Sequence, residues 1–483
     1  KNNKLLYTEG VAMNAVNKDE LTFIKEINSN QIINSTLDIA ESSVLFINNQ
    51  SKEKLEKLIS EALDKNLQTI VTSENCSISH EKIIKVNNYE EKFNEVFTKL
   101  CPRYQDKNFY GITGTNGKTT TGFYLNQLIR DRSLFVGTTE EDIFRKVTNE
   151  EHLTTPKLFN ILKLLGLNEY KDINNVVIEV SSHALDQERL KGLKFKISGF
   201  TNLSQDHFDY HKSIENYFNS KLKLFSNNVS EKLVYIDSDW GNKINSLTKI
   251  PSFSIGKSKK NNLYIKKINI DKEKYDLIFE LEGKNFEITV PLSGPESHLN
   301  YLLALSMAYF SEISNLEKIL EASTSLKNPR GRFEIIKYKN NNDVIIDFAH
   351  TPESITQVIK FVKNKYRKVI VIFGAGGNRD KEKRVLMGKS VNEADKVIIT
   401  NDNPRNENEE DIAKEILKGI KLNKETKVIL DRKEAILEGI NNLDKDSVLL
   451  ILGKGHEKIQ EFKNSTIKFS DQDVVNQYIR EDS

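Results

Sequence analysis

The segment GITGTNGKTT, residues 111–120, is the most informative part of this sequence. It follows an apolar run over 107–112 that predicts a strand, and it leads into a stretch over 118–130 that predicts a helix. In this order of strand, glycine-rich turn and helix, successive backbone N–H groups and the positive end of the helix point at an anion. The segment is therefore typical of a phosphate-binding loop, in which Lys118 would reach the outer phosphates of a nucleotide and Thr119 would bind Mg²⁺.

The loop departs from the standard pattern of such sites at one position. The standard pattern has glycine five residues before Gly117, where this sequence has Ile112. We interpret the loop as a GTNGKT variant. A glycine-rich turn that only caps a helix is the alternative, and the Lys-Thr-Thr sequence directly after Gly117 favours the phosphate site.

The length of 483 residues suggests about three domains of ordinary size. Residues 1–98 are rich in Lys, Asn and Glu, and they combine short predicted strands with an amphipathic helix over 52–65, which indicates a small α/β domain. The central part, 99–327, holds the phosphate loop, further α/β elements and a predicted helix over 299–311.

The C-terminal part contains five apolar runs separated by helical patterns, over 343–347, 368–373, 396–400, 427–430 and 447–452. This alternation is typical of a doubly wound parallel sheet, in which ligands bind beyond the carboxyl ends of the strands. The predicted fold class is α/β with three domains. They are an N-terminal domain over 1–98, a central P-loop ATPase-like mononucleotide-binding domain over 99–327, and a C-terminal Rossmann-like doubly wound domain over 328–483.

Composition excludes several classes of protein. The 71 Lys and Arg residues nearly balance the 69 Asp and Glu residues, and a formal net charge of +2 argues against an extended nucleic-acid-binding surface. The two cysteines, Cys76 and Cys101, are too few for a disulfide framework or a CxxC zinc site, and they suit a reducing compartment. No apolar run is long enough to span a membrane, and residues 1–7 lack the apolar region of a signal peptide. We expect a cytoplasmic protein.

Two further segments carry groups that suit a metal beside a nucleotide. Glu179 lies in an apolar run over 175–180, and His207 lies in the segment NLSQDHFDYH over 202–211. Mg²⁺ prefers oxygen ligands and a few carboxylates next to phosphates, so both residues would be ligands if the two segments open onto the same crevice. The alternative is that the histidines here are hydrogen-bonded structural residues. Four of the eight in the chain gather in this region: His152, His183, His207 and His211.

Eight segments in a fixed order resemble those of one known family. They are GTNGKTT (114–120), EVSSHALDQER (179–189), FTNLSQDHFDYH (200–211), GRFE (331–334), DFAHTP (347–352), FGAGGNRDKEKR (373–384), DNPR (402–405) and GKGHE (453–457). Together they resemble the Mur ligases of peptidoglycan synthesis, most closely the MurE group, whose members add the third residue of the stem peptide. The resemblance covers residues 99–475 well and the N-terminal part only faintly.

The resemblance implies a three-domain enzyme that forms an amide bond with ATP. In this family the γ-phosphoryl group passes to the D-Glu side-chain carboxylate of UDP-MurNAc-L-Ala-D-Glu, and the amine of a diamino diacid then displaces phosphate from the acyl phosphate. Lys118 and two Mg²⁺ ions would neutralise charge on the transferred group, and a closed site would keep water from the acyl phosphate. The implied enzyme is a monomer that binds no nucleic acid and has no membrane span.

The resemblance also assigns roles to individual residues. The ATP-binding residues match Gly114, Thr115, Asn116, Gly117, Lys118, Thr119 and Thr120, with Asn300 on the adenine side, Asp347 on the ribose side, and Arg332 and His350 on the phosphate side. The metal ligands match Thr119, Glu179, His207 and Lys221, the last as a carbamate formed with CO₂, and the catalytic residues match Lys118, Lys221 and His207. The contacts to the UDP-MurNAc-dipeptide match Ser35, Thr154, Thr155, Ser181, Gln187 and Arg189.

In this family the C-terminal domain selects the amino acid that is added, here called the acceptor. The residues that match the pocket of diaminopimelate-adding members are Arg379, Asp402, Asn403, Pro404, Arg405, Gly453 and Glu457. Arg405 can bind the distal carboxylate of meso-diaminopimelate bidentately. Asp402, Asn403 and Glu457 suit the ammonium group beside that carboxylate. Meso-lanthionine presents the same groups and stays an alternative, and an Asx–Pro turn with a solvated arginine is the structural alternative for DNPR.

Four positions depart from the family pattern. The N-terminal DSR-type motif appears only as Asn34-Ser35-Thr36, Ser297 replaces the first asparagine of the adenine segment, Phe348 replaces a tyrosine, and Leu153 replaces an asparagine. None of these changes removes a predicted phosphate, metal or acceptor-carboxylate residue, so we expect a divergent but active enzyme.

Three other functions stay open from the sequence. One is an L-lysine-adding MurE or another Mur-type ligase such as folylpolyglutamate synthase, which shares GTNGK-like and acyl-phosphate features. Another is a P-loop ATPase or regulatory nucleotide-binding module, which would turn over nucleotide without an amine acceptor. The third is an inactive homologue that serves as a scaffold. DNPR and the segment 179–189 favour the diaminopimelate-adding ligase.

Overall fold

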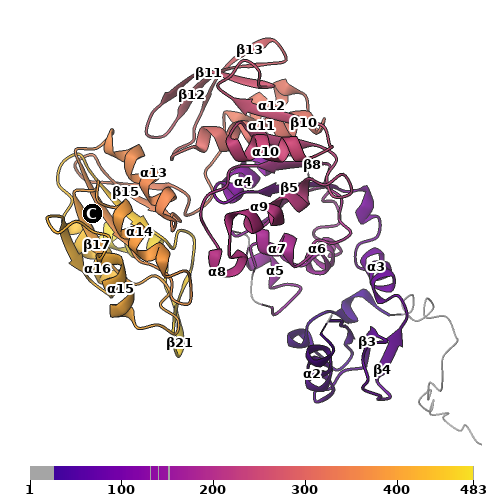
Figure 1. The fold of residues 1–483 in the computed structure, drawn as a ribbon. Helices are drawn as coiled ribbons and strands as arrows, with labels where there is room; N and C mark the ends of the chain where they lie inside the picture. The colour runs from indigo at the N-terminus through magenta and orange to yellow at the C-terminus, as the bar shows by residue number, and fades with distance from the viewer. Residues whose placement is uncertain (1–26, 50, 131, 140, 151–152, 482–483) are drawn as a thin grey trace, which may run out of the picture. The chain divides into compact units, whose positions relative to one another are not determined.

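A computed structural model of the chain describes residues 27–481, with gaps at 50, 131, 140 and 151–152 (Figure 1). The chain divides into two compact units, Lys1–Lys107 with Glu141–Ile173, and Asn108–Glu140 with Asn174–Ser483. The segment 141–173, which falls inside the predicted central domain, therefore groups with the N-terminal residues. The domain boundaries at 98 and 327 stay predictions.

The first unit is built on a parallel sheet with the strand order β1-β2-β3-β4. The strands are β1 (Ile32–Ile33), β2 (Val44–Phe46), β3 (Thr69–Ser73) and β4 (Ile83–Val86). Helix α2 (Lys52–Leu63) buries Leu55 and Ile59 in the core of this unit, as its amphipathic pattern predicts. Helices α3 (Tyr89–Leu100) and α6 (Leu158–Leu165) pack through the stacked rings of Phe93 and Phe159, whose centroids lie 5.9 Å apart.

The second unit contains a nine-stranded sheet of order β13-β12-β11-β10-β9-β8-β5-β7-β6. The bounds are β5 (Asn108–Thr113), β6 (Ser133–Val136), β7 (Asn175–Glu179), β8 (Ile197–Phe200), β9 (Leu233–Ile236), β10 (Ser252–Gly256), β11 (Leu263–Ile270), β12 (Tyr275–Leu281) and β13 (Lys284–Val290). Strands β5 to β11 pair in parallel, whereas β12 and β13 extend the sheet as an antiparallel hairpin. This hairpin was not predicted from the sequence. Its turn residues, Glu282 and Gly283, have φ angles of 51° and 78°, the geometry that an X-Gly turn favours.

Helices α4 (Lys118–Ile129) and α11 (Ser297–Phe310) share the core beside this sheet. Leu125 of α4 and Leu303 of α11 are fully buried there. Both helices carry apolar residues on most of their faces, which is expected when neighbouring elements enclose a helix. Helix α4 starts directly after the phosphate loop that follows β5. The start of α11 lies against that loop. The approach is so close that a Cβ atom at Gly117 would be only 2.4 Å from Oδ1 of Asn300.

The C-terminal part of the second unit is a six-stranded sheet of order β14-β15-β19-β16-β17-β18. Five strands are parallel: β15 (Asn342–Asp347), β16 (Lys368–Phe373), β17 (Lys396–Ile399), β18 (Glu425–Val428) and β19 (Ser447–Leu452), and β14 (Glu334–Tyr338) is an antiparallel edge strand. The doubly wound α/β fold predicted for this region is confirmed. Strand β18 begins and ends two residues before the predicted run 427–430, and the hairpin β20 (Ile459–Phe462) and β21 (Ser465–Lys468) was not predicted.

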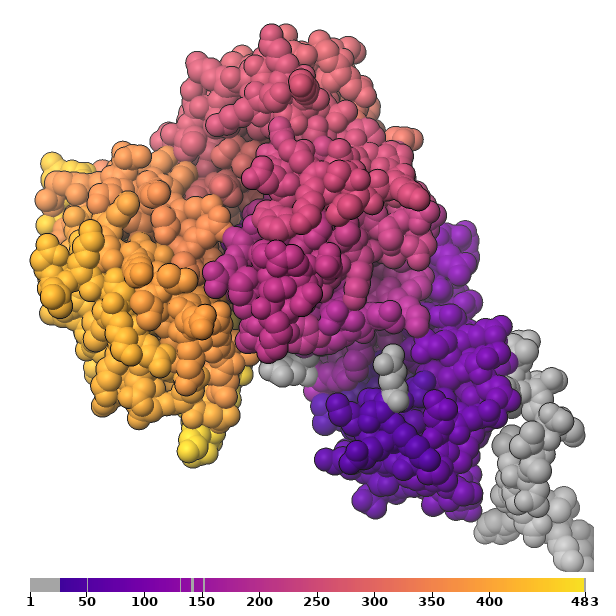
Figure 2. Space-filling view, viewed as in Figure 1, coloured from indigo at the N-terminus to yellow at the C-terminus, as the bar shows by residue number. Residues whose placement is uncertain are grey.

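Helices cover both faces of this sheet. Helices α13 (Pro352–Lys363), α14 (Glu382–Ser390) and α15 (Glu409–Leu417) contribute to one apolar core, and α16 (Arg432–Asn441) and α17 (Asp471–Glu481) contribute to the other. Alternate residues of each strand enter the two cores: Val371 joins the first and Ile370 the second. Figure 2 shows the orange and yellow residues of this region packed against the magenta residues of the nine-stranded region. Among the described residues, no helix combines the length and the apolar character needed to cross a membrane.

Candidate active site

The phosphate loop joins β5 to α4 in a conformation that requires glycine at two positions. Gly114 and Gly117 have φ angles of 153° and 84°, in the region that side chains disfavour. A Cβ atom at Gly114 would lie 1.8 Å from Oγ1 of Thr201, so there is no space for a side chain at that position either. The glycine spacing therefore lets the loop backbone lie close against its neighbours at the start of α4.

Lys118 lies at the first position of α4 and folds back over the loop. Its Nζ donates to the carbonyls of Gly114 (3.1 Å) and Thr115 (2.8 Å). Burial lowers the pKa of Lys118, while the nearby carboxylates of Glu179 and Asp206 oppose that shift. The ammonium group is thus held at the mouth of the loop, where a nucleotide phosphate would bind.

Glu179 meets the phosphate loop because β7 and β5 are neighbours and their carboxyl ends lie at the same edge of the sheet. The hydroxyl of Thr119 donates to Oε2 of Glu179 at 2.9 Å, and the backbone N–H and hydroxyl of Thr138 donate to the same oxygen at 3.1 and 3.0 Å. Glu179 is only 2 % exposed. Two of the predicted metal ligands are therefore in direct contact beside the loop.

Arg332 brings a cation to the same place from the turn before β14. Its Nη2 donates to the Thr119 hydroxyl at 3.1 Å, and its guanidinium lies 4.3 Å from the centre of the Phe348 ring. Burial lowers the pKa of Arg332, which the carboxylates of Glu179 and Asp347 oppose. Nε of Arg332 is buried and has no hydrogen-bond partner among the described residues. A buried donor without a partner favours an anionic ligand at this position.

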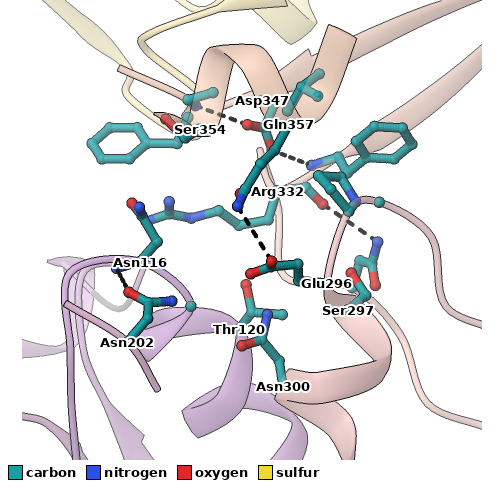
Figure 3. Close-up of a pocket in the computed structure, with 18 of the residues that line it drawn as sticks. Asn116, Thr120, Asn202, Glu296, Ser297, Asn300, Arg332, Asp347, Ser354 and Gln357 are labelled. Atoms are coloured by element: carbon teal, nitrogen blue, oxygen red, sulfur yellow. Dashed lines mark hydrogen bonds between the residues drawn. The ribbon is translucent and has the colours of Figure 1, made fainter. Parts of the chain in front are cut away.

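Arg332 and part of the phosphate loop border a cleft (Figure 3). Of the predicted nucleotide-binding residues, it is lined by Asn116, Gly117, Thr120, Asn300, Arg332, Asp347 and His350. The carboxylate of Asp347 accepts the backbone N–H groups of Phe333 (2.7 Å) and Ala349 (2.8 Å), so it also fixes the two turns that carry the cleft wall.

Several residues that line the cleft were not predicted. They include Tyr124, Asn202, Glu296, Asn328, Phe348 and Gln357. Oε1 of Glu296 accepts the Gln357 amide at 3.2 Å, a bond drawn in Figure 3. Burial, and to a smaller degree Glu353, raises the pKa of Glu296. Asn202 and Phe348 lie in the quoted segments 200–211 and 347–352, whereas the sequence signal near Glu296 was the Gly294-Pro295 turn, which marks the start of α11 but not a ligand.

Lys221 and His207 also lie near the phosphate loop. Lys221, on helix α9 (Ile214–Leu222), is 1 % exposed, and its Nζ donates to the Gly114 carbonyl at 2.7 Å. Burial, reinforced by the charge of Lys118, lowers the pKa of Lys221 well below its ordinary value. Burial also lowers the pKa of His207 to about 3, although the Asp206 carboxylate, 3.5 Å away, opposes the shift. Burial therefore disfavours the charged form of both groups.

The other predicted histidines have different surroundings. Nε2 of His211 lies 2.9 Å from the hydroxyl of Ser182, which fits the structural alternative for this residue. The ring of His183 stands nearly perpendicular to that of His207, with centroids 4.8 Å apart. His152 lies outside the described residues.

The donor set around the loop suits Mg²⁺ in part. No group of three or more His, Cys, Asp or Glu side chains arranged for a metal is present in the described part of the chain. The Thr119 hydroxyl, the Glu179 carboxylate and the neutral His207 imidazole supply too few anionic oxygens on their own, which fits an ion that also binds nucleotide phosphates.

The acceptor residues come together at the carboxyl ends of three neighbouring strands. Arg379 follows β16, residues 402–405 follow β17, and Gly453 follows β19. Gly453 has a φ angle of 109°, and a Cβ atom there would lie 2.7 Å from Oδ2 of Asp402. Nδ2 of Asn403 donates to Oε2 of Glu457 at 2.9 Å. All three loops therefore border one small polar site.

Arg405 is not a solvated arginine. Its Nη1 donates to the Gly377 carbonyl at 3.0 Å, and its Nε pairs with Oε2 of Glu461 at 2.8 Å. A Cβ atom at Gly376 would lie 3.1 Å from Nη1 of Arg405 and 3.6 Å from Cγ of Arg379, so the two arginines flank the same glycine. The Arg405 guanidinium suits a ligand that carries a carboxylate, whereas Arg379 is exposed and its Nη1 donates to the Asn378 carbonyl at 3.4 Å.

Residues 112–308 match the Mur ligase middle domain, and residues 331–455 match the Mur ligase glutamate ligase domain. A UDP-N-acetylmuramoyl-L-alanyl-D-glutamate–2,6-diaminopimelate ligase from Rickettsia bellii (strain RML369-C) is 35 % identical over 433 residues, which cover 86 % of this chain and 90 % of the relative. The chain belongs to the Mur ligase family.

Two further comparisons extend this result to the N-terminal part of this Mur ligase. A 2,6-diaminopimelate ligase of the same name from Wigglesworthia glossinidia brevipalpis is 35 % identical over 493 residues, which cover 96 % of both chains. A solved structure of a ligase with this name covers 94 % of this chain and 95 % of its own, with 24 % identity and a TM-score of 0.61, and it supports the fold. Membership of the family implies that this Mur ligase uses ATP.

The residues predicted to bind the UDP-MurNAc-dipeptide fall into both units of this Mur ligase. Ser35, Thr154 and Thr155 belong to the first unit, and the Ser35 hydroxyl accepts the Leu37 N–H at 3.3 Å. Ser181, Gln187 and Arg189 belong to the second, directly before and after helix α7 (Ser182–Asp186), where Arg189 donates to the Gln187 side chain at 2.8 Å. Their role as one binding surface stays a prediction.

Proposed function

We propose that this chain is an ATP-dependent ligase that joins meso-diaminopimelate to the D-Glu side-chain carboxylate of UDP-MurNAc-L-Ala-D-Glu in peptidoglycan synthesis. The observation that carries the choice of acceptor is the site beyond β16, β17 and β19. There Arg379 and Arg405 flank Gly376, and Asn403 bonds to Glu457. Relatives named as diaminopimelate ligases match this chain over most of its length.

The reaction requires a phosphoryl transfer followed by an acyl transfer. An oxygen of the D-Glu carboxylate bonds to the γ-phosphorus, the bond from that phosphorus to the bridging oxygen breaks, and ADP leaves. The acceptor amine then attacks the acyl carbon, the nitrogen loses a proton, and phosphate leaves. Lys118 and Arg332 lie where they would neutralise charge on the transferred group. Asn300 and Asp347 would hold the nucleoside in the cleft.

Thr119, Glu179 and His207 are the residues that would hold Mg²⁺, together with Lys221 as a carbamate. When bound, the ion would neutralise phosphate charge and align the transferred group with the carboxylate. The lowered pKa of Lys221 supports the carbamate, because a neutral amine is the form that reacts with CO₂. The new N–C bond releases one proton and turns a potential cation beside Lys118 into an anion, which would be attracted to that lysine.

The acceptor site argues against some of the alternative acceptors and functions that the sequence left open. L-lysine would leave Arg405 and Arg379 without a distal carboxylate to bind, and meso-lanthionine would engage the same groups as diaminopimelate. A nucleotide-hydrolysing module or an inactive scaffold would not need the acceptor site. We also propose a cytoplasmic monomer, with the domain division 1–98, 99–327 and 328–483. The buried free thiols of Cys76 and Cys101 suit a reducing compartment.

Phosphate release with purified full-length protein tests the proposal. Phosphate should appear only when ATP, UDP-MurNAc-L-Ala-D-Glu and meso-diaminopimelate are all present, with the tripeptide product detected by mass spectrometry. L-lysine in place of diaminopimelate should support much slower release. Phosphate release that does not depend on the acceptor would favour the nucleotide-hydrolysing module.

A further inference from the structure

We infer that Lys454 is a positioning residue for the acceptor site, which rests on the proposed function. Lys454 is fully buried, and its Nζ donates to Oδ1 of Asn403 at 2.9 Å and to Oε2 of Glu457 at 2.6 Å. Both partners are residues predicted to bind the ammonium group of the acceptor. Because Lys454 is fully buried, it contacts these two side chains and not a ligand that enters from solvent.

Lys454 fixes the orientation of the Asn403 amide. Its ammonium has only donors, so the atom of Asn403 that it contacts must be the carbonyl oxygen. The backbone N–H of Glu461 donates to the same oxygen at 3.1 Å. The amide NH₂ group is thereby directed to Glu457, whose Oε2 accepts it at 2.9 Å. The side chains of Lys454, Asn403 and Glu457 therefore all hydrogen-bond to one another, and the donor and the acceptor of each bond are defined.

Lys454 also favours the charged form of the Glu457 carboxylate. Burial and the neighbouring Asp402 carboxylate raise the pKa of Glu457, and Lys454 is the main group that opposes this rise. The Glu457 side chain is still 29 % exposed, so the carboxylate can contact a ligand while Lys454 holds one of its oxygens. Without the lysine, two carboxyl groups would lie close together with less compensating charge, and Glu457 would attract the acceptor ammonium less.

The test is Lys454→Met in the full chain, with separate KM values for meso-diaminopimelate, ATP and UDP-MurNAc-L-Ala-D-Glu and a thermal unfolding curve. Lys396→Met is the matched control. Lys396 is also buried and paired, with Glu425 at 2.9 Å and the Asn442 side chain at 2.6 Å, but it starts β17 whereas Asn403 follows the end of that strand. We expect KM for diaminopimelate to rise about tenfold or more only in Lys454→Met, with the other two KM values within about twofold.

A second variant separates positioning from general damage. If Lys454 acts through Glu457, then Lys454→Met should add less than about threefold to the KM of a Glu457→Gln protein. The inference is overturned if the KM increases of the two single variants multiply fully in the double variant. It is also overturned if all three KM values rise equally in Lys454→Met. If the methionine variant does not fold, Lys454→Gln, which keeps an NH₂ group but loses the positive charge, should show the same selective rise. A wild-type protein that turns over ATP but uses no diamino acid overturns the proposed function itself, whereas normal wild-type kinetics with an unchanged KM in Lys454→Met overturns only the role of Lys454.

Discussion

Replacing Arg405 with alanine should weaken the binding of meso-diaminopimelate and leave nucleotide binding unchanged. The arginine guanidinium carries five N–H donors. Among the described residues two of them are engaged, Nη1 with the Gly377 carbonyl at 3.0 Å and Nε with the Glu461 carboxylate at 2.8 Å. The other three are enough for a bidentate pair with the distal carboxylate of the acceptor.

The structure also sets the size of the effect. A hydrogen bond to a charged group contributes about 1.5–3 kcal/mol. The Arg405 side chain is 26 % exposed, so solvent screens the pair and the lower part of that range applies. Since 1.36 kcal/mol corresponds to a factor of ten, a loss of about 1.5–2 kcal/mol raises KM for diaminopimelate about 10- to 30-fold.

Steady-state phosphate release, with diaminopimelate varied at saturating ATP and UDP-MurNAc-dipeptide, measures this KM. Arg405→Lys keeps the charge but loses the planar pair of donors, so it should give an intermediate value. L-lysine is an internal control because it has no distal carboxylate, and its KM should not respond to Arg405→Ala. A diaminopimelate KM that stays at the wild-type value in Arg405→Ala would refute the assignment of this arginine to the acceptor.

Three further predictions concern the nucleotide cleft and two partly exposed histidines, His207 and His350. Lys118→Ala should abolish phosphate release while the far-ultraviolet circular dichroism spectrum stays unchanged, and a near-normal rate would remove Lys118 from the site. Gly117→Ala should weaken ATP binding in calorimetry and lower the free energy of unfolding by about 1–3 kcal/mol, because the new Cβ lies 2.4 Å from Oδ1 of Asn300 at a φ angle of 84°. Burial lowers the pKa of His207 to about 3 and that of His350 to about 4, against 6.5 for an ordinary histidine, so the unfolded chain binds protons first as pH falls. The free energy of unfolding from urea titrations should therefore be highest above pH 6.5 and decrease from there toward pH 4; a value independent of pH over that interval would contradict these shifts.

Local patterns in the sequence predicted the parts of the site that depend on a few adjacent residues. The phosphate loop is one case, since the positions of Gly114 and Gly117 between a strand and a helix already imply their backbone geometry. Glu179 and the residues after β17 are similar, because ligands in parallel sheets bind beyond the carboxyl ends of the strands. The helix bounds of α4 and α11 also lie within two residues of the predicted ones.

Other parts depend on contacts between distant segments. Arg332 and Thr119 are 213 positions apart, and only the family resemblance placed them at one nucleotide. Glu296 and Gln357 meet across the cleft without any local signal, and Lys454 reads as an ordinary surface lysine until the fold buries it against Asn403. The β12–β13 hairpin is different. Its Glu282-Gly283 turn was present in the sequence, and the expectation of continuous α/β alternation obscured it.

The most direct test of this account follows an oxygen atom. UDP-MurNAc-L-Ala-D-Glu labelled with ¹⁸O in the D-Glu side-chain carboxylate is converted with ATP and meso-diaminopimelate, and the released phosphate is analysed by mass spectrometry. An acyl phosphate predicts that each phosphate carries one ¹⁸O atom from the peptide. Unlabelled phosphate would show that ATP is hydrolysed by water, and that the cleft does not activate the peptide carboxylate for the amine.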